Sequence, residues 1–163
     1  MIRNATMQDV SRIAEIIVFG KRVAYRSIFQ NDVFSFNELQ VINLIEEYRN
    51  NPEIINNMLV YDDGIVKGVI NRAFKDDVVE ICELYVEPFF KGKGVGKELI
   101  QQVISEAQTS KKNSIFLWVI EENWSARRFY ENNGFIANGK TGFIEGTTKT
   151  EMCYEMTLER HGY

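Results

Sequence analysis

The hydrophobic positions in the first third of the chain recur every three or four residues, as they do on one face of an amphipathic helix. A strand-like stretch at residues 2–5 comes before the first such pattern, which covers residues 10–17. Residues 20–31 are expected to form a second helical piece. A further helical pattern over residues 39–48 must end before Pro52, because proline restricts the residue in front of it.

Short apolar runs separated by turn residues dominate the middle of the chain. The runs at residues 58–61 and 65–73 flank Asp62-Asp63-Gly64, and Asp-Gly between two such runs is a hairpin signal. A third run at residues 78–86 follows a polar turn at residues 75–77. The pattern therefore predicts three consecutive strands joined by tight turns.

Helical and strand patterns alternate in the rest of the chain. A helix is predicted over residues 95–108 and a strand over residues 114–120. Residues 135–144 and 151–158 are then typical of a closing hairpin. The predicted order is a strand, helices, a three-strand meander, a helix, a strand, a short helix and closing strands.

Composition and charge restrict the class of protein. The 163 residues are 45% hydrophobic and 26% charged, which is typical of a single globular domain, here residues 1–163. The net charge of −4 argues against a nucleic-acid partner, because nucleic-acid-binding surfaces are usually basic. No stretch reaches the roughly 20 apolar residues that cross a bilayer, and the N-terminus has no signal-peptide pattern. We therefore expect neither a nucleic-acid partner nor a membrane partner.

Two cysteines, Cys82 and Cys153, are too few for a disulfide framework and fit a reducing compartment. Both lie in strand-like runs, so both are expected to be buried thiols. Together with the absence of a targeting pattern, they predict a cytoplasmic protein.

One segment carries candidate chemistry. Three glycines alternate with other residues in Lys91-Gly92-Lys93-Gly94-Val95-Gly96-Lys97, between a predicted strand and a predicted helix. Closely spaced glycines suit a sharp turn that lets a ligand approach the backbone amides. Amides at a helix N-terminus favour a bound anion, and the three lysines add positive charge. The segment is predicted to cradle phosphate.

The glycine spacing excludes two common nucleotide loops. A P-loop has four residues between its first Gly and Gly-Lys-Ser/Thr. Here three residues separate Gly92 from Gly96, and Glu98 takes the place of the hydroxyl. The dinucleotide fingerprint Gly-x-Gly-x-x-Gly fails as well, because Leu99 stands three residues beyond Gly96.

The segment resembles the acyl-CoA-binding motif of the GNAT-type N-acetyltransferases, Arg/Gln-x-x-Gly-x-Gly/Ala, with Lys91 where Arg or Gln is usual. A later stretch is similar to the second family motif, Asn-x-x-Ala-x-x-Phe-Tyr-x-x-x-Gly-Phe, at every named position. That stretch is Asn123-Trp124-Ser125-Ala126-Arg127-Arg128-Phe129-Tyr130-Glu131-Asn132-Asn133-Gly134-Phe135. Asn123 and Gly134 are also good N-cap and C′ residues, so they bracket a short helix. The chain is identified as a member of this family, although its N-terminal third matches in pattern only.

The resemblance implies an α/β (α+β) architecture, the GNAT acyl-CoA N-acyltransferase fold. Its mixed central sheet of about seven strands is flanked by helices and has a splayed gap between the two central strands, here at residues 84–86 and 116–120. Pro88 lacks an N–H and should help to end strand pairing there, which opens a slot for the thioester. Acetyl-CoA is the implied donor substrate, with no metal. The residues expected to bind it are Leu84, Tyr85, Val86, Lys91, Gly92, Lys93, Gly94, Val95, Gly96, Lys97, Asn123 and Tyr130.

The implied reaction is direct transfer of the acetyl group to a primary amine of a small molecule within a ternary complex. Tyr130 matches the position that the family uses to protonate the departing thiolate, and a tyrosine of pKa near ~10 is a workable acid for a thiol of pKa near ~8.5. The amine must lose a proton before it attacks. Glu83, an acidic residue in an otherwise apolar strand, is the first candidate base, because burial would strengthen it, and Glu87 is the second. For each glutamate, a solvated or salt-bridged side chain is the alternative.

The acceptor is less well specified. In this fold residues 21–34 and 138–150 would build its pocket. The candidate lining residues are Tyr25, Arg26, Phe29, Phe34 and Phe143. Aromatic residues at such spacing are also typical of a core, and Arg26 either recognises an acidic group of the acceptor or is solvated. His161, in a polar tail, is given no catalytic role.

Several functions stay open at this level. Polyamines, amino acids and aminoglycoside-like amines are all candidate small-molecule acceptors. A protein N-terminal or lysine acetyltransferase is the alternative within the enzyme class, and a non-catalytic CoA-binding sensor is the alternative outside it. The fold often forms a homodimer, but no residue pattern indicates a surface for one.

Overall fold

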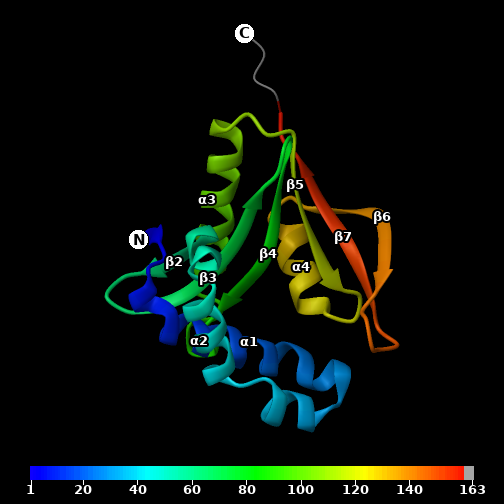
Figure 1. Ribbon diagram of the computed structural model, residues 1–163. Helices are drawn as coiled ribbons and strands as arrows, with labels where there is room; N and C mark the ends of the chain where they lie inside the picture. Colours follow the sequence, from blue (N-terminus) through cyan, green and yellow to red (C-terminus); the bar gives the residue numbers. More distant parts are fainter. Residues whose placement is uncertain (160–163) are drawn as a thin grey trace. The chain divides into compact units, whose positions relative to one another are not determined.

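The computed structural model describes residues 1–159, so His161 lies outside the described residues. Its strands are β1 (Ile2–Asn4), β2 (Met58–Asp62), β3 (Val66–Phe74), β4 (Val78–Val86), β5 (Ser114–Ile120), β6 (Ile136–Phe143) and β7 (Thr150–Thr157). Its α-helices are α1 (Val10–Phe29), α2 (Val41–Asn50), α3 (Val95–Thr109) and α4 (Trp124–Asn132). The strands form a seven-stranded mixed sheet in the order β1-β2-β3-β4-β5-β7-β6 (Figure 1). The predicted order of elements and the sheet of about seven strands are confirmed.

Contacts within the chain define two units. The first contains Met1–Arg72 and Glu83–Gln102, and the second contains Ala73–Cys82 and the chain from Val103 onward. Three elements, β3, β4 and α3, contribute residues to both units.

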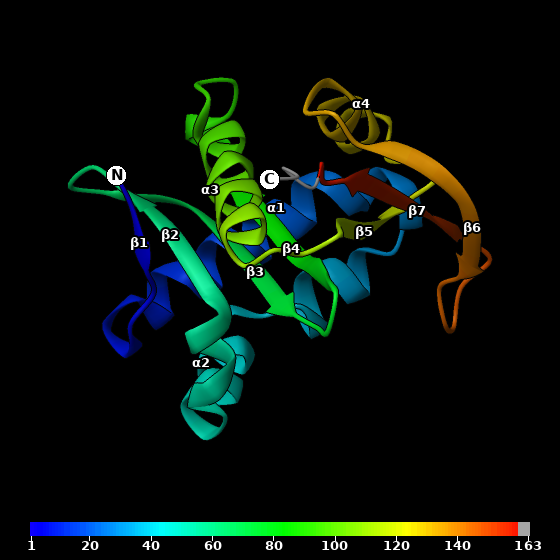
Figure 2. The ribbon, with the colours of Figure 1, turned by 90° about the horizontal axis from the view of Figure 1, so that it is seen from above.

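In the first unit, β1 and β3 pair with β2 in antiparallel register (Figure 2). Helix α1 packs against α2, as the blue and cyan ribbons show in Figure 1. Buried apolar side chains join these helices to the strands. The core includes Val10, Ile13, Ile16, Ile17, Tyr48, Ile55, Met58, Val60 and Val69. The helical spacing in the sequence therefore marked the buried face of α1 correctly.

Helix α1 is longer than the sequence predicts. Residues 20–29 continue the helix that begins at Val10, instead of forming a second piece. Glycine inside a helix costs about 1 kcal/mol relative to alanine, which favours a break at Gly20. A Cβ at Gly20 would lie 2.6 Å from Cδ1 of the Tyr85 ring in β4. Gly20 is therefore required by a close contact with a distant strand, and the helix continues through it.

In the second unit, β7 pairs with β5 on one side and with β6 on the other, both in antiparallel register (Figure 2). Residues 78–81 of β4 pair in parallel with residues 114–117 of β5. Helix α4 is fastened to this part of the sheet by the buried Tyr154. Its hydroxyl donates a 2.8 Å hydrogen bond to Glu131 and accepts a 3.1 Å hydrogen bond from Arg127.

The two cysteines differ. Cys153 is buried as predicted, but the prediction that Cys82 is buried is wrong, because its side chain is exposed. Cys82 follows Ile81, which is 4% exposed, and neighbouring strand residues point to opposite faces. Among the described residues, no helix is both long enough and apolar enough to cross a membrane.

Candidate functional site

The predicted phosphate cradle begins where β4 ends. The Glu87 N–H donates a 2.8 Å hydrogen bond to the Lys67 carbonyl, and Pro88 then starts a single 3-10 turn, η4 (Pro88–Phe90). Gly92 and Gly94 adopt φ values of 75° and 83°, in the left-handed region that glycine enters readily. A Cβ at either position would meet no atom of the described residues within 4 Å. The two glycines are thus required by the backbone conformation, and they leave open space above the loop.

Helix α3 starts directly after this loop. An early hydrogen bond runs from the Glu98 N–H to the Gly94 carbonyl over 3.0 Å. The amides of Val95, Gly96 and Lys97 come before that bond, so the helix supplies no carbonyl to accept them. Such amides, at the positive end of the helix dipole, suit a phosphate group. The chemistry of the loop therefore fits the diphosphate of a CoA thioester.

Lysine side chains surround the loop. Lys91, Lys93 and Lys97 are all exposed. The Nζ atom of Lys93 lies 5.6 Å from the centroid of the Phe90 ring, and Nζ of Lys67 in β3 lies 4.7 Å from the same centroid. These cation–π contacts hold two ammonium groups beside the start of the loop. Lys67 is also paired with Asp63 over 2.6 Å, so the positive charge at the loop comes from the three exposed lysines.

A glycine in β3 sets the position of α3. A Cβ at Gly68 would lie 2.7 Å from Cγ1 of Val95 and 3.1 Å from Cδ1 of Leu99. Both of these α3 residues are buried. Only a residue without a side chain allows the first turn of α3 to approach β3 this closely. The same contact fixes the amides that follow the glycine loop.

Glu87 is committed to an ion pair. Its carboxylate lies 2.8 Å from Nη1 of Arg12 in α1, and its side chain is 8% exposed. Arg12 also donates a hydrogen bond to the Val66 carbonyl and contacts Glu15. The second candidate base therefore joins α1, β3 and the end of β4. The salt-bridged alternative for Glu87 matches this geometry.

Glu83 lies in a less enclosed environment. Its Oε1 is 3.5 Å from Nζ of Lys21 in α1, and the two side chains are 26% and 27% exposed. Tyr48 of α2 is buried, and this burial is the main reason that the pKa of its phenol lies above the ordinary value. The negative charge of Glu83 raises the same pKa further. Glu83 is therefore a half-buried carboxylate with a lysine and a tyrosine near it.

Two tyrosines lie next to the Glu83–Lys21 pair, one on α1 and one on β4. The hydroxyls of Tyr25 in α1 and Tyr85 in β4 are 2.9 Å apart and share a hydrogen bond. Tyr85 also packs against Gly20. Glu83 and Tyr85 are two residues apart in β4 and therefore point to the same face of the strand, where both side chains contact α1.

The second motif lies in the second unit. Asn123 caps α4, and its side-chain oxygen accepts a 3.2 Å hydrogen bond from the Ala126 N–H. Gly134 follows the helix with a φ of 91°, so the predicted cap residues are confirmed at both ends. Tyr130 is 9% exposed, and its ring makes an edge contact with the fully buried Phe135 at 5.9 Å between centroids. The motif thus also specifies a well-packed helix.

The acceptor candidates separate in the structure. Tyr25 and Phe29 form a T-shaped ring pair on α1. Arg26 forms an ion pair with Asp32, and its side chain is 58% exposed, so it is a solvated arginine that already has a carboxylate partner. Phe34 lies in the π-helical turn η2 (Phe34–Glu38) and is 39% exposed, whereas Phe143 at the end of β6 is 81% exposed. Neither phenylalanine is a core residue.

The first unit brings together most of the predicted site. Residues 83–97 and the α1 candidates Tyr25, Arg26 and Phe29 lie there, whereas Asn123, Tyr130 and Phe143 lie in the second unit. Sequence reasoning did not single out Lys21 or Arg12 as partners of the two glutamates. Both residues lie on the helical face next to the apolar stripe of α1, and this position could have indicated that they contact the sheet. A helix pattern does not, however, say which strand that face contacts. Among residues 1–159, no group of three or more His, Cys, Asp or Glu side chains could hold a metal ion.

The strand, glycine loop and helix within a seven-stranded mixed sheet define the class of the protein, an α/β acyltransferase fold. The acetyltransferase (GNAT) domain family matches residues 30–156, well over half of the chain. The chain therefore belongs to the GNAT acetyltransferase domain family, as the two motifs predicted.

Relatives and solved structures agree with this assignment. The chain is 39% identical over 66 residues to an uncharacterized N-acetyltransferase of Methanocaldococcus jannaschii, a match that covers 40% of this chain and 29% of that protein. Matches to further curated relatives cover 36% and 54% of their lengths, so the chain spans only about a third to a half of these proteins.

Two solved structures share the fold. The first is the PaiA N-acetyltransferase of Thermoplasma acidophilum in complex with coenzyme A, with a TM-score of 0.73, 18% identity and coverage of 97% of this chain and 98% of that one. The second is YncA of Salmonella typhimurium with its cofactor acetyl-CoA, with a TM-score of 0.69, 22% identity and coverage of 100% and 96%. At these identities the likeness shows the fold alone.

Proposed function

We propose that the chain is a single-domain N-acetyltransferase that moves the acetyl group of acetyl-CoA directly to a primary amine of a small molecule in a ternary complex. The observation that carries the proposal is the glycine loop. Gly92 and Gly94 hold left-handed conformations with open space above them, directly before the unpaired amides of α3. The coenzyme A and acetyl-CoA bound to two proteins of the same fold support the identity of the donor.

The loop would hold the diphosphate of the donor through the amides of Val95, Gly96 and Lys97. Lys91 and Lys93 would add electrostatic attraction, which salt should weaken because both are exposed. The backbone of residues 84–86 would pair with the amide-bearing pantetheine arm in the manner of an added strand. In this proposal the side chains of the loop contribute less than its backbone.

Glu83 would accept the proton of the attacking amine, directly or through water. Its side chain is 26% exposed, and it lies just before the proposed pantetheine strand. An amine of pKa near ~10 is almost fully protonated at neutral pH, so a base in reach of it is required. Lys21 would hold the carboxylate toward α1 and would be displaced or shared when a cationic amine approaches.

Glu87 would have a structural role at the site and no role in proton transfer. Its carboxylate is nearly buried and paired with Arg12, so protonation of Glu87 would leave this half-buried arginine without its counter-charge. The pair would instead keep the end of β4 in place for the loop that follows. We assign the base to Glu83 alone.

Tyr130 would give a proton to the thiolate of CoA. It comes from the second family motif, where Asn123 would also contact the donor. Two free cysteines support a reducing, cytoplasmic compartment for this chemistry. A protein N-terminal or lysine acetyltransferase and a CoA-binding sensor are the competing functions.

Thiol release from acetyl-CoA tests the proposal. The panel contains a polyamine, amino acids, an aminoglycoside, a peptide with a free N-terminus and a lysine peptide with a blocked N-terminus. We expect release with at least one small amine and slower release with both peptides. Faster release with a peptide would assign a protein acceptor. Acetyl-CoA binding without release for any amine would assign the sensor.

The Glu83→Gln variant tests the base, with Glu80→Gln as the matched control on the same strand. Loss of the base should lower kcat by about 10²-fold without changing acetyl-CoA affinity. Glu80 is paired with Lys75 and should tolerate the same change without loss of rate. Equal rates for Glu83→Gln and the wild type would remove Glu83 from the mechanism.

A further inference from the structure

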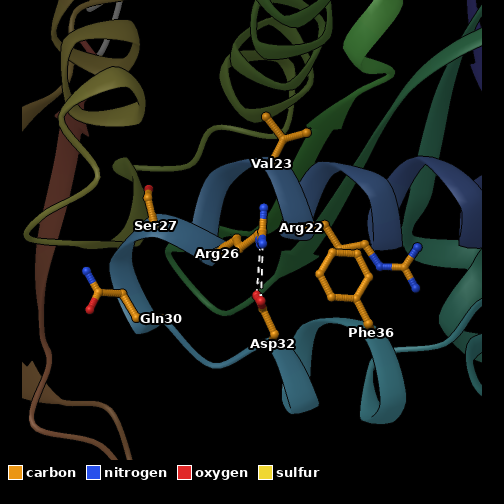
Figure 3. A pocket seen from close by; sticks show the side chains of 7 residues that line it. All are labelled: Arg22, Val23, Arg26, Ser27, Gln30, Asp32 and Phe36. Atoms are coloured by element: carbon orange, nitrogen blue, oxygen red, sulfur yellow. Dashed lines mark hydrogen bonds and ion pairs between the residues drawn. The ribbon is translucent and has the colours of Figure 1, made fainter.

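A pocket of about 650 Å³ lies against the C-terminal half of α1 (Figure 3). It is lined from α1 by Arg22, Val23, Arg26 and Ser27, and from the segment after α1 by Asp32 and Phe36. Phe36 belongs to the π-helical turn η2, and Gln30 at the end of α1 has a left-handed φ of 50°. Both irregularities bend the chain back along α1, which creates the hollow.

Arg22 is fixed in this pocket before any ligand arrives. Its Nε donates a 2.8 Å hydrogen bond to the Ser35 carbonyl, and its Nη2 donates a 3.0 Å hydrogen bond to the Leu39 carbonyl. Its guanidinium carbon lies 5.4 Å from the Phe19 ring and 5.3 Å from the Phe36 ring. Carbonyls and rings orient the group but do not neutralise it. Among the described residues, no carboxylate forms an ion pair with Arg22.

Arg26 stands one helical turn further on and is held differently. Asp32 accepts hydrogen bonds of 2.8 Å from its Nε and 3.1 Å from its Nη2, as the dashed lines in Figure 3 show. Its guanidinium carbon lies 5.5 Å from the Phe36 ring. Two arginines and one aspartate therefore give the pocket one net positive charge beside an aromatic wall. In a chain of net charge −4 this concentration of positive charge is local.

The pocket adjoins the proposed catalytic region through α1 itself. Lys21 contacts Glu83, and Tyr25 contacts Tyr85. Each of these two α1 residues is followed directly by a pocket residue, Arg22 or Arg26. Successive helical residues are rotated by about 100°, so these two pairs lie on neighbouring stripes of one helix. A small molecule with its amine near Glu83 can therefore extend an attached group over α1.

We propose that this pocket binds an anionic group of the amine acceptor, of the carboxylate kind, attached to an apolar or aromatic body. Arg22 supplies the charge and its remaining N–H donors on Nη1, and Phe36 with Val23 contacts the apolar part. Asp32 limits the attraction by pairing with Arg26. The inference rests on the proposed acetyl transfer, and it selects acidic amines over polyamines as acceptors.

Binding of two matched amines in the presence of CoA, which carries no acetyl group, tests the pocket apart from catalysis. The probes are 4-(aminomethyl)benzoate and 4-(aminomethyl)benzamide, which differ in the charge at one end. Titration calorimetry should show about tenfold tighter binding of the benzoate, as expected for a hydrogen bond to a charged group. The Arg22→Met variant should remove this preference, and Arg49→Met, a change of the same kind on α2, should keep it. Equal binding of the two probes, or a preference that survives Arg22→Met, overturns the proposal.

A variant that is expected to bind the benzoate more tightly keeps the test valid even if Arg22→Met does not fold. Arg22 also fastens η2, so melting curves must accompany Arg22→Met. Asp32→Asn, at an exposed position, leaves Arg26 without its carboxylate and should tighten binding of the benzoate several-fold, whereas Arg26→Met should weaken it. A structural role for these residues predicts no such opposite changes, and unchanged binding in both variants overturns the proposal.

Turnover with acetyl-CoA then separates this inference from the proposed function. Release of thiol with the benzoate at a KM about tenfold below that of the benzamide, lost in Arg22→Met, supports both. Release with equal KM values supports acetyl transfer and overturns the anion site. Arg22-dependent binding without release from either amine overturns the assignment of the pocket to an acceptor, whereas the proposed function is overturned only if the whole amine panel also gives no release.

Discussion

The Arg12 guanidinium and the Glu87 carboxylate lie 2.8 Å apart, and this ion pair joins the first half of α1 to the residue directly after β4. Arg12 also binds the Val66 carbonyl, so one side chain contacts three elements. Because Glu87 directly precedes Pro88 and the glycine loop, the pair determines where the loop begins.

Replacement of Arg12 by methionine should destabilise the protein by about 2–3 kcal/mol, because it leaves a nearly buried carboxylate without its partner. The exposure of Arg12, at 29%, keeps this below the cost of breaking a fully buried pair. Urea denaturation measures the change. The double variant Arg12→Met with Glu87→Gln should recover part of the loss, and a single variant as stable as the wild type would show that the pair is not important for folding.

The left-handed conformation of Gly92 offers a test of the loop with a closely matched control. Gly92 and Gly146 have φ values of 75° and 74°, and neither has an atom within 4 Å of the position of a Cβ. Alanine at either site should cost about 1 kcal/mol of stability from backbone strain. Only Gly92→Ala should also weaken acetyl-CoA binding, measured by calorimetry, because its methyl group occupies the space above the cradle. An equal loss of affinity in both variants would mean that strain, not the ligand site, is responsible.

The sequence predicted local structure better than it predicted contacts. Asn123 and Gly134 marked the ends of α4 correctly, because capping depends on residues near in sequence. The break expected at Gly20 was wrong because the reason for that glycine, the Tyr85 ring, lies in another element. The roles of Glu83 and Glu87 could not be separated for the same reason, since their partners Lys21 and Arg12 come from α1.

The contact between Gly20 and Tyr85 predicts an unusual result for a helix. Alanine at an interior helical glycine normally gains about 1 kcal/mol. Here the Cβ would lie 2.6 Å from a ring that the Tyr25 hydroxyl holds in place, and overpacking of this kind costs about 1–3 kcal/mol. Gly20→Ala should therefore lower the melting temperature. In Gly142→Ala, where the nearest atom would be 3.8 Å away, no such loss is expected, and a stabilised Gly20→Ala would refute the packing argument.

Arg3 and Asp9 predict a defined response to acid. The side-chain hydrogen bond from Arg3 lowers the pKa of Asp9 below its ordinary value, against the opposing effect of burial. Because the pKa of Asp9 is lower in the folded state, the ionised carboxylate stabilises the protein at any pH above the ordinary Asp pKa near ~3.9. This contribution to stability is lost as the pH falls through the folded-state pKa.

Asp9→Asn should cost about 1–3 kcal/mol at pH 7, and the difference from the wild type should shrink below about pH 4. Chemical denaturation across this range measures both effects. Asp32→Asn removes an exposed ion pair and should change stability little at any pH, since exposed pairs contribute little. A loss in Asp9→Asn that is constant with pH would assign it to packing instead of charge.

The Tyr130 hydroxyl is the group of the second motif to which we assign a catalytic role. Its ring contacts Phe129 and Phe135, and phenylalanine preserves both contacts. Tyr130→Phe should therefore fold normally and bind acetyl-CoA with nearly unchanged affinity. If the hydroxyl protonates the departing thiolate, turnover should fall by about 10²-fold.

Tyr61→Phe, which removes a hydroxyl from β2, is the matched control and should keep its rate. Steady-state thiol release gives kcat for both variants, and calorimetry gives the affinity for acetyl-CoA. A fall in affinity that accounts for the whole loss of rate would make Tyr130 a donor-binding residue, and an unchanged kcat would leave the protonation to another group.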